Sequence, residues 1–211
     1  KKIIKKKIKN FNGHTFYIAQ ITNVKKPVML LTSPKISVIP ITQHLSLKKA
    51  IKKITKNRII WTTIIANKFL IKDFGLIKPK IAISGLNPHA GEDGIFGNEE
   101  KRIIEPAIKK IKSYGINVSG PYPADTVFNK QILKCFDLVI CMYHDQATIP
   151  IKTIDFQNGV NITLGLSIIR TSPDHGTALD IAGKGKASEK SLFAALTKAN
   201  EIALKRKNWI Q

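Results

Sequence analysis

Five short apolar runs along the chain constrain its fold more than any other feature of the sequence. Each run is bounded by polar or turn-forming residues and is too short for a buried helix, which is typical of strands buried on both faces. The runs are Pro27 to Thr32, Ile36 to Thr42, Lys80 to Ser84, Phe136 to Met142 and Val160 to Leu166. We therefore expect them to be the strands of a sheet.

Stretches with helical spacing of apolar residues lie between these runs. We predict one helix from Ser46 through Lys56 and a second helical run that follows it to about Asp73 and is ended by Gly75. Further helices are predicted from Asn98 to Gly115, with Glu99 and Glu100 in the first turn, and from Ser191 to Arg206. Strands that alternate with helices predict an α/β fold with helix layers on both faces of the sheet. A length of 211 residues allows one domain or two small ones.

The chain is strongly basic, with a formal net charge of +21 at pH 7. Such a charge is common in nucleic-acid-binding proteins, but only four of the 35 basic residues are arginine, the residue preferred for bidentate contacts to bases and phosphates. The excess of lysine and isoleucine is more typical of compositional drift, so we expect nucleic-acid binding only as an alternative. The charge would still attract anionic substrates.

The cysteine content and the apolar runs bear on the compartment. The two cysteines, Cys135 and Cys141, lie in or beside an apolar run, which favours a reducing cytoplasm over a disulfide framework. Lysines interrupt every long apolar run, so no membrane-spanning segment is expected.

Lysine is almost absent from two windows of this lysine-rich chain, Ile81 to Glu100 and Cys135 to Gly183, where Lys152 is the only one. Motifs rich in chemically active residues lie inside these windows, which indicates a functional site there. Three histidines follow predicted strands, and ligands of α/β sheets gather beyond the carboxyl ends of strands. Imidazole is a common ligand of divalent metals, but the spacing of His44, His89 and His144 matches no local metal motif. All five histidines, including His14 and His175, lie in loop-like contexts.

Four further residues are candidates for the site, and two of them, Asp125 and Asn161, also have an ordinary interpretation. Asp125 in G-P-Y-P-A-D-T either caps a following helix or acts as a carboxylate near a metal. Lys152 and Arg170 suit recognition of a phosphate or carboxylate. Asn161 is a polar residue in a strand, with or without a special role. No G-x-G-x-x-G motif follows a strand, so a Rossmann dinucleotide site is not indicated.

Together these motifs resemble those of the 4-hydroxythreonine-4-phosphate dehydrogenases, NAD-dependent enzymes of vitamin B6 biosynthesis. The resemblance extends in order over nearly the whole chain and depends on long motifs. The matching motifs are G-H-T (Gly13 to Thr15), T-x-H-L-x-L (Thr42 to Leu47), G-L-N-P-H-A-G-E (Gly85 to Glu92), G-P-x-P-A-D-T (Gly120 to Thr126), M-Y-H-D-Q (Met142 to Gln146), V-N-I-T-L-G-L (Val160 to Leu166) and I-R-T-S-x-D-H-G-T-A (Ile169 to Ala178).

The resemblance implies a set of site residues and cofactors. It implies a divalent metal (zinc, magnesium or cobalt) bound by His44, His89 and His144 at a homodimer interface, with one histidine from the partner chain. It assigns phosphorylated-substrate binding to His14, Thr15, Lys152, Asn161 and Arg170, and catalytic roles to Asp125, Asp145 and Lys152. The implied reaction is NAD-dependent oxidation and decarboxylation of 4-phosphohydroxy-L-threonine to 3-amino-2-oxopropyl phosphate. A preference between NAD and NADP, and the residues that contact the cofactor, are not implied.

The resemblance also implies a fold similar to isocitrate dehydrogenase, with α/β/α layers in two lobes and a cleft between them. We expect residues 10–140 to form the central lobe, which also dimerises, and residues 141–211 to return to the NAD-side lobe. The family's N-terminal portion, with its G-D-P-A-G-I-G-P-E loop, has no counterpart here, so the first lobe is expected to be incomplete. Phe16 stands where the family has glutamate, and Ala147 where it has glycine.

Three alternative functions stay open at this point. The chain could be an inactive truncated remnant that retains metal binding and dimerisation. It could be a basic nucleic-acid-binding module, with steeply salt-dependent binding to RNA. A metal-dependent hydrolase would use the same histidines without NAD.

Overall fold

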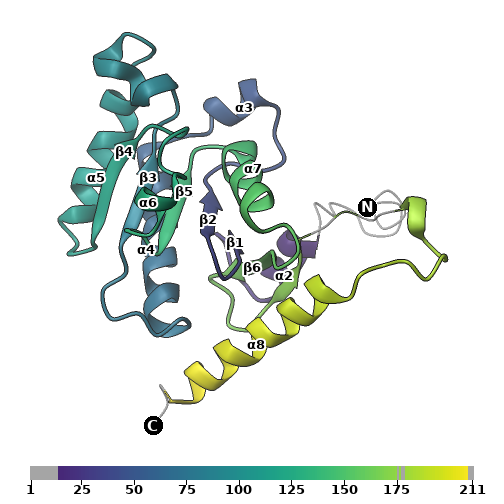
Figure 1. The fold of residues 1–211 in the computed structure, drawn as a ribbon. Coiled ribbons are helices and arrows are strands. Elements are labelled where there is room, and N and C mark those ends of the chain that lie inside the picture. Colours follow the sequence, from purple (N-terminus) through teal and green to yellow (C-terminus); the bar gives the residue numbers. More distant parts are fainter. Residues whose placement is uncertain (1–13, 175, 177–178, 209–211) are drawn as a thin grey trace.

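The computed structural model describes residues 14–174, 176 and 179–208. These residues form a mixed seven-stranded sheet in the order β4-β3-β5-β2-β1-β6-β7, with helices on both faces (Figure 1). The strands are β1 (Val28–Thr32), β2 (Ser37–Pro40), β3 (Ile81–Ser84), β4 (Val118–Tyr122), β5 (Leu138–Cys141), β6 (Val160–Leu164) and β7 (Thr171–Pro173).

The strand directions bring five carboxyl ends to the same side of the sheet. Strands β4, β3, β5 and β2 are parallel neighbours. Strand β1 is antiparallel to both β2 and β6, so β6 runs in the same direction as β2, and β7 is antiparallel to β6. We call the edge where β2, β3, β4, β5 and β6 end the carboxyl edge. In α/β sheets, ligands are bound at this edge.

Two helix layers cover the sheet. Helices α4, α5 and α8 contribute to the core on one face, and α7 and α6 to the core on the other (Figure 1). The helical segments are α2 (His14–Ile21), α3 (Leu47–Ile51), α4 (Lys56–Lys72), η1 (Pro88–Gly94), the π-turn η2 (Glu100–Ile104), α5 (Glu105–Lys112), α6 (Lys130–Leu133), α7 (His144–Asp155), η3 (Leu179–Ile181) and α8 (Lys190–Asn208). None of the described helices has the length and apolar character needed to cross a bilayer.

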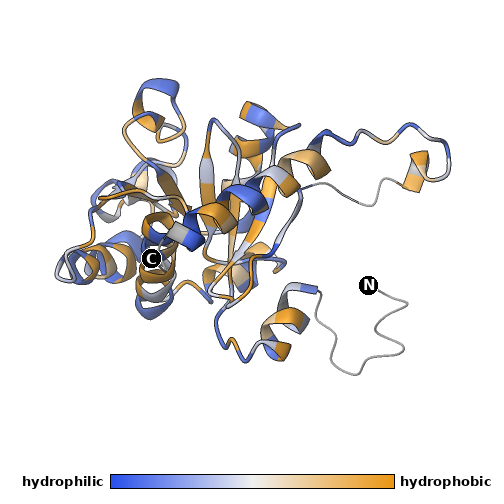
Figure 2. Ribbon diagram, turned by 90° about the horizontal axis from the view of Figure 1, so that it is seen from below, coloured by the Kyte–Doolittle hydropathy of each residue, from blue (hydrophilic) through white to orange (hydrophobic). Residues whose placement is uncertain are grey.

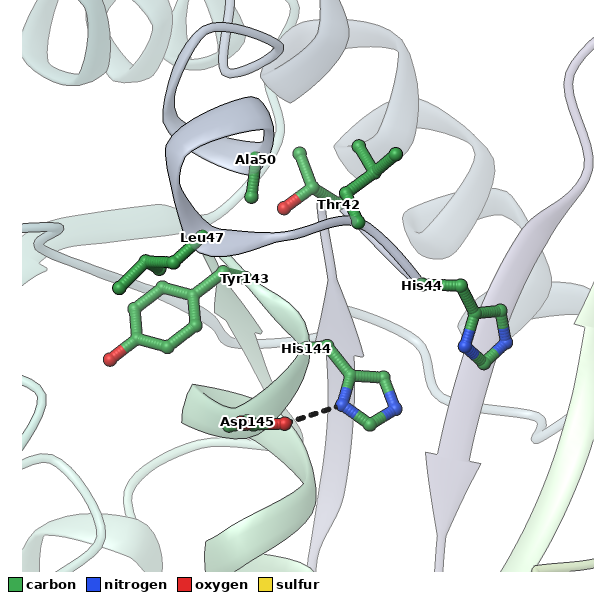
Figure 3. Close-up of a pocket in the computed structure, with 8 residues that line it drawn as sticks. Thr42, His44, Leu47, Ala50, Tyr143, His144 and Asp145 are labelled. Carbon is green, nitrogen blue, oxygen red and sulfur yellow. Dashed lines mark hydrogen bonds and ion pairs between the residues drawn. The ribbon is translucent and has the colours of Figure 1, made fainter.

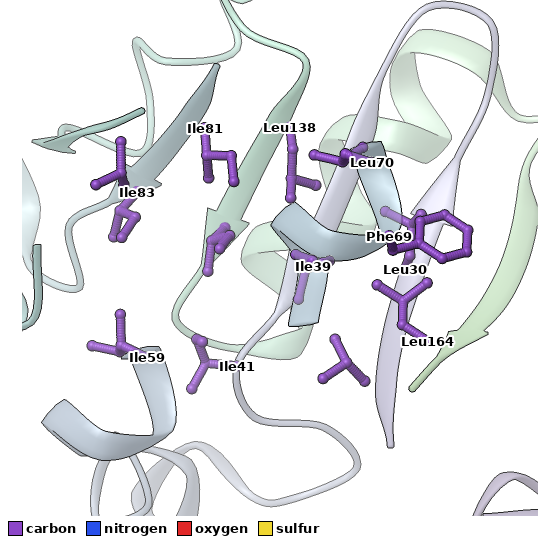
Figure 4. Close-up of a cluster of buried hydrophobic side chains, with 14 of the residues drawn as sticks. Leu30, Ile39, Ile41, Ile59, Phe69, Leu70, Ile81, Ile83, Leu138 and Leu164 are labelled. Carbon is purple, nitrogen blue, oxygen red and sulfur yellow. The ribbon is translucent and has the colours of Figure 1, made fainter. Parts of the chain in front are cut away.

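The hydrophobic core is divided between the two faces because successive strand residues point in opposite directions. Leu30 and Ile39 pack towards α4, against Phe69 and Leu70 (Figure 4), whereas Leu31 and Val38 pack on the α7 side. The helices carry both hydrophobic and hydrophilic residues (Figure 2), as expected for elements with one face on the sheet and one in solvent.

The five predicted strands and the α/β class are confirmed. The first predicted helix is shorter than expected, because α3 ends at Ile51 rather than at Lys56. The second predicted helical run corresponds to α4. Strand β4 was missed because Gly120 and Pro121 are typical of turns, and helix α7 because it contains Pro150. The predicted division at residue 140 stays a prediction, although strands from both predicted lobes belong to one sheet.

Candidate active site

The carboxyl edge gathers the histidines that the sequence placed after strands. His44 follows β2, His144 follows β5 and His89 follows β3, and these three strands are neighbours in the sheet. The prediction that all five histidines lie in loops is only partly correct. His144 is the first residue of α7, and His14 is the first residue of α2. His175 lies outside the described residues.

His44 and His144 face each other across the ends of β2 and β5. Their ring centroids are 5.5 Å apart with the rings tilted by 43°. Beneath them, the Thr42 hydroxyl donates to the carbonyl of Met142 at 3.0 Å, which holds the two strand ends together. Both histidines line an open pocket of about 290 Å³, with Tyr143 and Asp145 (Figure 3).

Asp145 fixes the His144 ring. Its Oδ1 lies 2.6 Å from His144 Nδ1, so Nε2 is left to bind a ligand. Metal-binding histidines are commonly oriented in this way by a carboxylate on the other nitrogen. With metal–nitrogen distances of about 2.0–2.1 Å, two imidazoles on one ion have centres roughly 5 Å apart. The geometry of the pair therefore fits a shared divalent ion.

The third histidine is not part of this pair. His89 lies in η1, exposed, with its ring centroid 5.8 Å from that of Phe96. Across the described part of the chain, no three His, Cys, Asp or Glu side chains come close enough to hold a metal ion. A three-histidine site within a single chain is thus not formed, and the expected contribution from a partner chain stays a prediction.

The loop that carries His89 has an unusual backbone. Residues 89–93 all have positive φ, although only Gly91 among them is a glycine. The fully buried Glu100 anchors this loop from below by accepting hydrogen bonds from the backbone amides of Leu86 (2.7 Å) and Asn87 (2.8 Å) and from the Asn87 side chain (2.8 Å). The sequence indicated Glu100 only as a first-turn helix residue and Asn98 as the helix cap, but the N-cap is Glu99, without a side-chain cap.

A second polar group is centred on Arg170. Its Nη1 donates to the hydroxyl of Thr163 at 3.0 Å and lies 3.4 Å from that of Thr15 in α2. Partial burial lowers the pKa of Arg170 from its ordinary value, yet a guanidinium stays charged. The oxygen Asn161 Oδ1 is buried and has no hydrogen-bond partner. Asn161 and Thr163 alternate on β6 and so share one face of the sheet.

The sequence had identified Thr15, Asn161 and Arg170 but not Thr163. The signal that could have revealed it is the period of two in V-N-I-T, which places the Thr163 hydroxyl beside Asn161. His14 begins the same helix as Thr15.

Asp125 and Lys152 are less closely associated with these groups. Neither lines the pocket of His44 and His144. Asp125 is exposed in the turn after β4, and it does not cap the next helix, because Asn129 is the N-cap of α6. Lys152 is exposed on α7, about two turns beyond His144. Ala147 is fully buried in α7 and packs in the core.

The fold and site define an α/β protein with histidines and an arginine-centred group at the carboxyl edge of its sheet. The sequence model of the family described as "Pyridoxal phosphate biosynthetic protein PdxA" matches residues 1–199, so the chain belongs to this family.

Relatives and solved structures agree with this membership. A 4-hydroxythreonine-4-phosphate dehydrogenase from Bradyrhizobium diazoefficiens is 51% identical over 195 residues, covering 90% of this chain and 56% of the relative. A putative D-threonate 4-phosphate dehydrogenase from Oceanobacillus iheyensis is 49% identical, covering 92% of this chain and 58% of the relative. The crystal structure of 4-hydroxythreonine-4-phosphate dehydrogenase from Klebsiella pneumoniae matches with a TM-score of 0.83 and 43% identity, over 92% of this chain and 59% of that chain. The chain therefore spans just over half the length of these relatives.

Proposed function

We propose that this chain takes part in the NAD-dependent oxidation and decarboxylation of 4-phosphohydroxy-L-threonine in vitamin B6 biosynthesis. The observation that carries the proposal is the paired arrangement of His44 and His144, with Asp145 holding the Nδ1 side of the His144 ring. Family membership and the name of the Bradyrhizobium relative support the choice of substrate.

His44 and His144 would hold a divalent ion of zinc, magnesium or cobalt, and His89 of a second copy would complete the ligand set in a homodimer. Such an ion lowers the pKa of a bound hydroxyl and so favours its deprotonation. The role of Asp145 is to keep Nδ1 of His144 occupied, which presents Nε2 in a fixed direction.

The group around Arg170 would anchor the substrate by its anionic end. The guanidinium is held by Thr163 and Thr15, and His14, which precedes Thr15 in α2, would add a donor for a phosphate. The unpartnered oxygen of Asn161 would accept a hydrogen bond from a substrate amino or hydroxyl group. Lys152 would contribute a cation to phosphate binding and Asp125 a catalytic carboxylate, although neither lines the pocket of His44 and His144.

NAD would accept the hydride, which the protein has only to position. The described residues contain no G-x-G-x-x-G turn, so the cofactor would be bound in another manner. We assign no residue to its contacts.

A second candidate substrate is D-threonate 4-phosphate, named for the Oceanobacillus relative. It also carries a phosphate and a secondary hydroxyl. The two substrates differ where an amino group is replaced by a hydroxyl, and both of these groups can donate to Asn161 Oδ1. The site thus favours the phosphorylated hydroxy-acid class, and direct competition must distinguish its members.

The test is NADH formation by the purified chain with NAD, a divalent metal and either substrate. His144→Ala should abolish turnover, whereas Gln131→Ala, an exposed substitution on α6, should leave it unchanged. Equal turnover by the wild type and His144→Ala would exclude the proposed metal role. A folded wild type that binds metal but forms no NADH would instead support the inactive remnant. Substrate hydrolysis without NAD would support a hydrolase.

A further inference from the structure

Gln146 is a buried amide directly beside the proposed metal site. It follows His144 by two residues in α7, and its side chain points inward with only 8% of the residue exposed. Its oxygen accepts hydrogen bonds from the backbone amide of Met142 (2.7 Å) and from the hydroxyl of Ser84 (2.9 Å). Its nitrogen donates to the carbonyl of Gly85 at 2.9 Å. The bonds fill both acceptor positions of the amide and one of its two donors.

These partners belong to the ends of two neighbouring strands. Met142 follows β5 and leads to His144, whereas Ser84 ends β3 and Gly85 follows it towards His89. The paired register of β3 and β5 stops at Ile83 and Ile140. Just beyond that point, the Gln146 amide connects the two chains through donor and acceptor groups like those of a peptide. The Gln146 side chain therefore replaces the next pair of backbone hydrogen bonds between β3 and β5.

The location makes this connection relevant to the histidines. Where the ladder ends, backbone pairing no longer holds the two strand ends in register. The loop beyond Gly85 is then fixed by Glu100, through Leu86 and Asn87. The relative positions of His144 and His89 thus depend on a chain of buried polar contacts that begins at Gln146. Metal sites lose affinity when their supporting groups shift by fractions of an ångström.

We propose that Gln146 is a positioning residue, which sets the separation and orientation of the His144 and His89 loops through its three hydrogen bonds. This inference rests on the proposed function, because it assigns the two histidines to metal sites. It predicts that the amide acts on metal affinity and coordination geometry without touching the metal.

The first test uses Gln146→Met, which keeps the length of the side chain and removes every hydrogen bond of the amide. Cobalt(II) is titrated into the full chain, and its absorption spectrum reports coordination geometry. We expect about a tenfold loss of cobalt affinity and an altered spectrum, as for other groups that orient metal ligands. Gln146→Glu, which can still accept from Met142 and Ser84, should lie between the wild type and the methionine variant. Gln131→Met is the matched control, because it makes the same change on an exposed helix.

A second measurement separates this proposal from the proposed function. The imidazole resonances of His89 and His144 are recorded without metal in the wild type, in Gln146→Met and in the milder Ser84→Ala, which removes only one of the three hydrogen bonds of Gln146. We expect both histidines to shift in Gln146→Met, whether or not the chain binds cobalt. Wild-type cobalt affinity and unshifted imidazoles in a folded Gln146→Met would overturn the proposal. If the imidazole resonances shift in Gln146→Met but His144→Ala leaves cobalt affinity unchanged, the metal role of His144 is overturned, whereas the positioning role of Gln146 is retained.

Discussion

The loops after β5 and β3 both begin at the carboxyl edge of the sheet, but they position their histidines differently. After β5, the chain enters α7 within two residues, and His144 is placed by the start of a regular helix. After β3, the chain passes through a left-handed turn that spans His89, and buried side chains rather than a helix hold it. The first histidine depends on secondary structure, and the second depends on Glu100.

This difference predicts different sensitivities to mutation. A helix N-terminus tolerates most single changes of exposed side chains, since backbone hydrogen bonds maintain it. A loop held by one carboxylate loses several hydrogen bonds when that carboxylate is removed. The following predictions test this contrast, in order of decreasing effect.

The largest effect is expected from Glu100→Ala. This change leaves the amides of Leu86 and Asn87 without their acceptor, and each unsatisfied buried group costs about 1–3 kcal/mol. We expect the free energy of unfolding in urea to fall by about 3 kcal/mol. Glu99→Ala removes only one side-chain hydrogen bond from Asn87 and should cost about 0.5 kcal/mol. Equal losses in the two variants would show that Glu100 does not anchor the loop.

Asp145→Asn should weaken metal binding without disturbing the fold. The substitution replaces the carboxylate on His144 Nδ1 by a neutral amide, so the ring is less firmly oriented. We expect roughly a tenfold loss of metal affinity, measured by calorimetric titration. Asp93→Asn, which changes an exposed carboxylate on the other loop, should retain the wild-type affinity. A loss of metal affinity in Asp93→Asn but not in Asp145→Asn would show that the carboxylate on the His89 loop, and not Asp145, supports metal binding.

Ala90→Gly should stabilise the chain. Ala90 has a φ of 52°, a left-handed conformation that costs an L-residue about 1–2 kcal/mol and glycine almost nothing. Glycine loses more conformational entropy than alanine on folding, which offsets part of this relief. We therefore expect the free energy of unfolding, measured by heat or urea, to rise by about 0.5 kcal/mol. The same change at Ala147, inside α7, should be destabilising. Destabilisation at both positions would show that the turn is not strained at Ala90.

The smallest effect concerns acid stability. The hydrogen bond from the Asn87 side chain lowers the pKa of Glu99 below its ordinary value of 4.5. The folded state therefore binds this proton less readily than the unfolded state. The resulting stabilisation is present above about pH 4.5 and is lost as the pH falls through the folded pKa. Between roughly pH 5 and pH 3, the free energy of unfolding in urea should decline less steeply for Glu99→Gln than for the wild type. Gln131→Ala, an exposed change that involves no titratable group, should follow the wild type.

The sequence predicted the fold where local patterns and tertiary structure agree. Continuous apolar runs predicted β1, β2, β3, β5 and β6 because these strands are buried on both faces. Strand β4 and helix α7 were missed because Gly120, Pro121 and Pro150 are usually turn residues. Pairing with β3 stabilises the strand, and packing on β2 and β5 stabilises the helix, so tertiary contacts override the local preference.

The sequence indicated which candidate residues follow strands, but not how they are arranged in space. Spacing after strands correctly placed His44 and His144 at one edge. Glu100 and Gln146 could not be found in this way because their hydrogen-bond partners are distant in sequence or lie on the backbone. Thr163 is indicated instead by the period of two on β6. A buried carboxylate that binds backbone amides leaves no pattern of its own in the sequence.

The parallel pairing of β2 with β5 has a consequence for the order of folding. Strands β1 and β2 form a local hairpin, but Val38 of β2 pairs with Val139 of β5, about a hundred positions later in the chain. Closing so long a loop has a high entropic cost until other contacts have formed, so this pairing is expected late. His44 and His144 meet only when it is complete. A metal ion would therefore stabilise the finished sheet by mass action rather than guide its assembly.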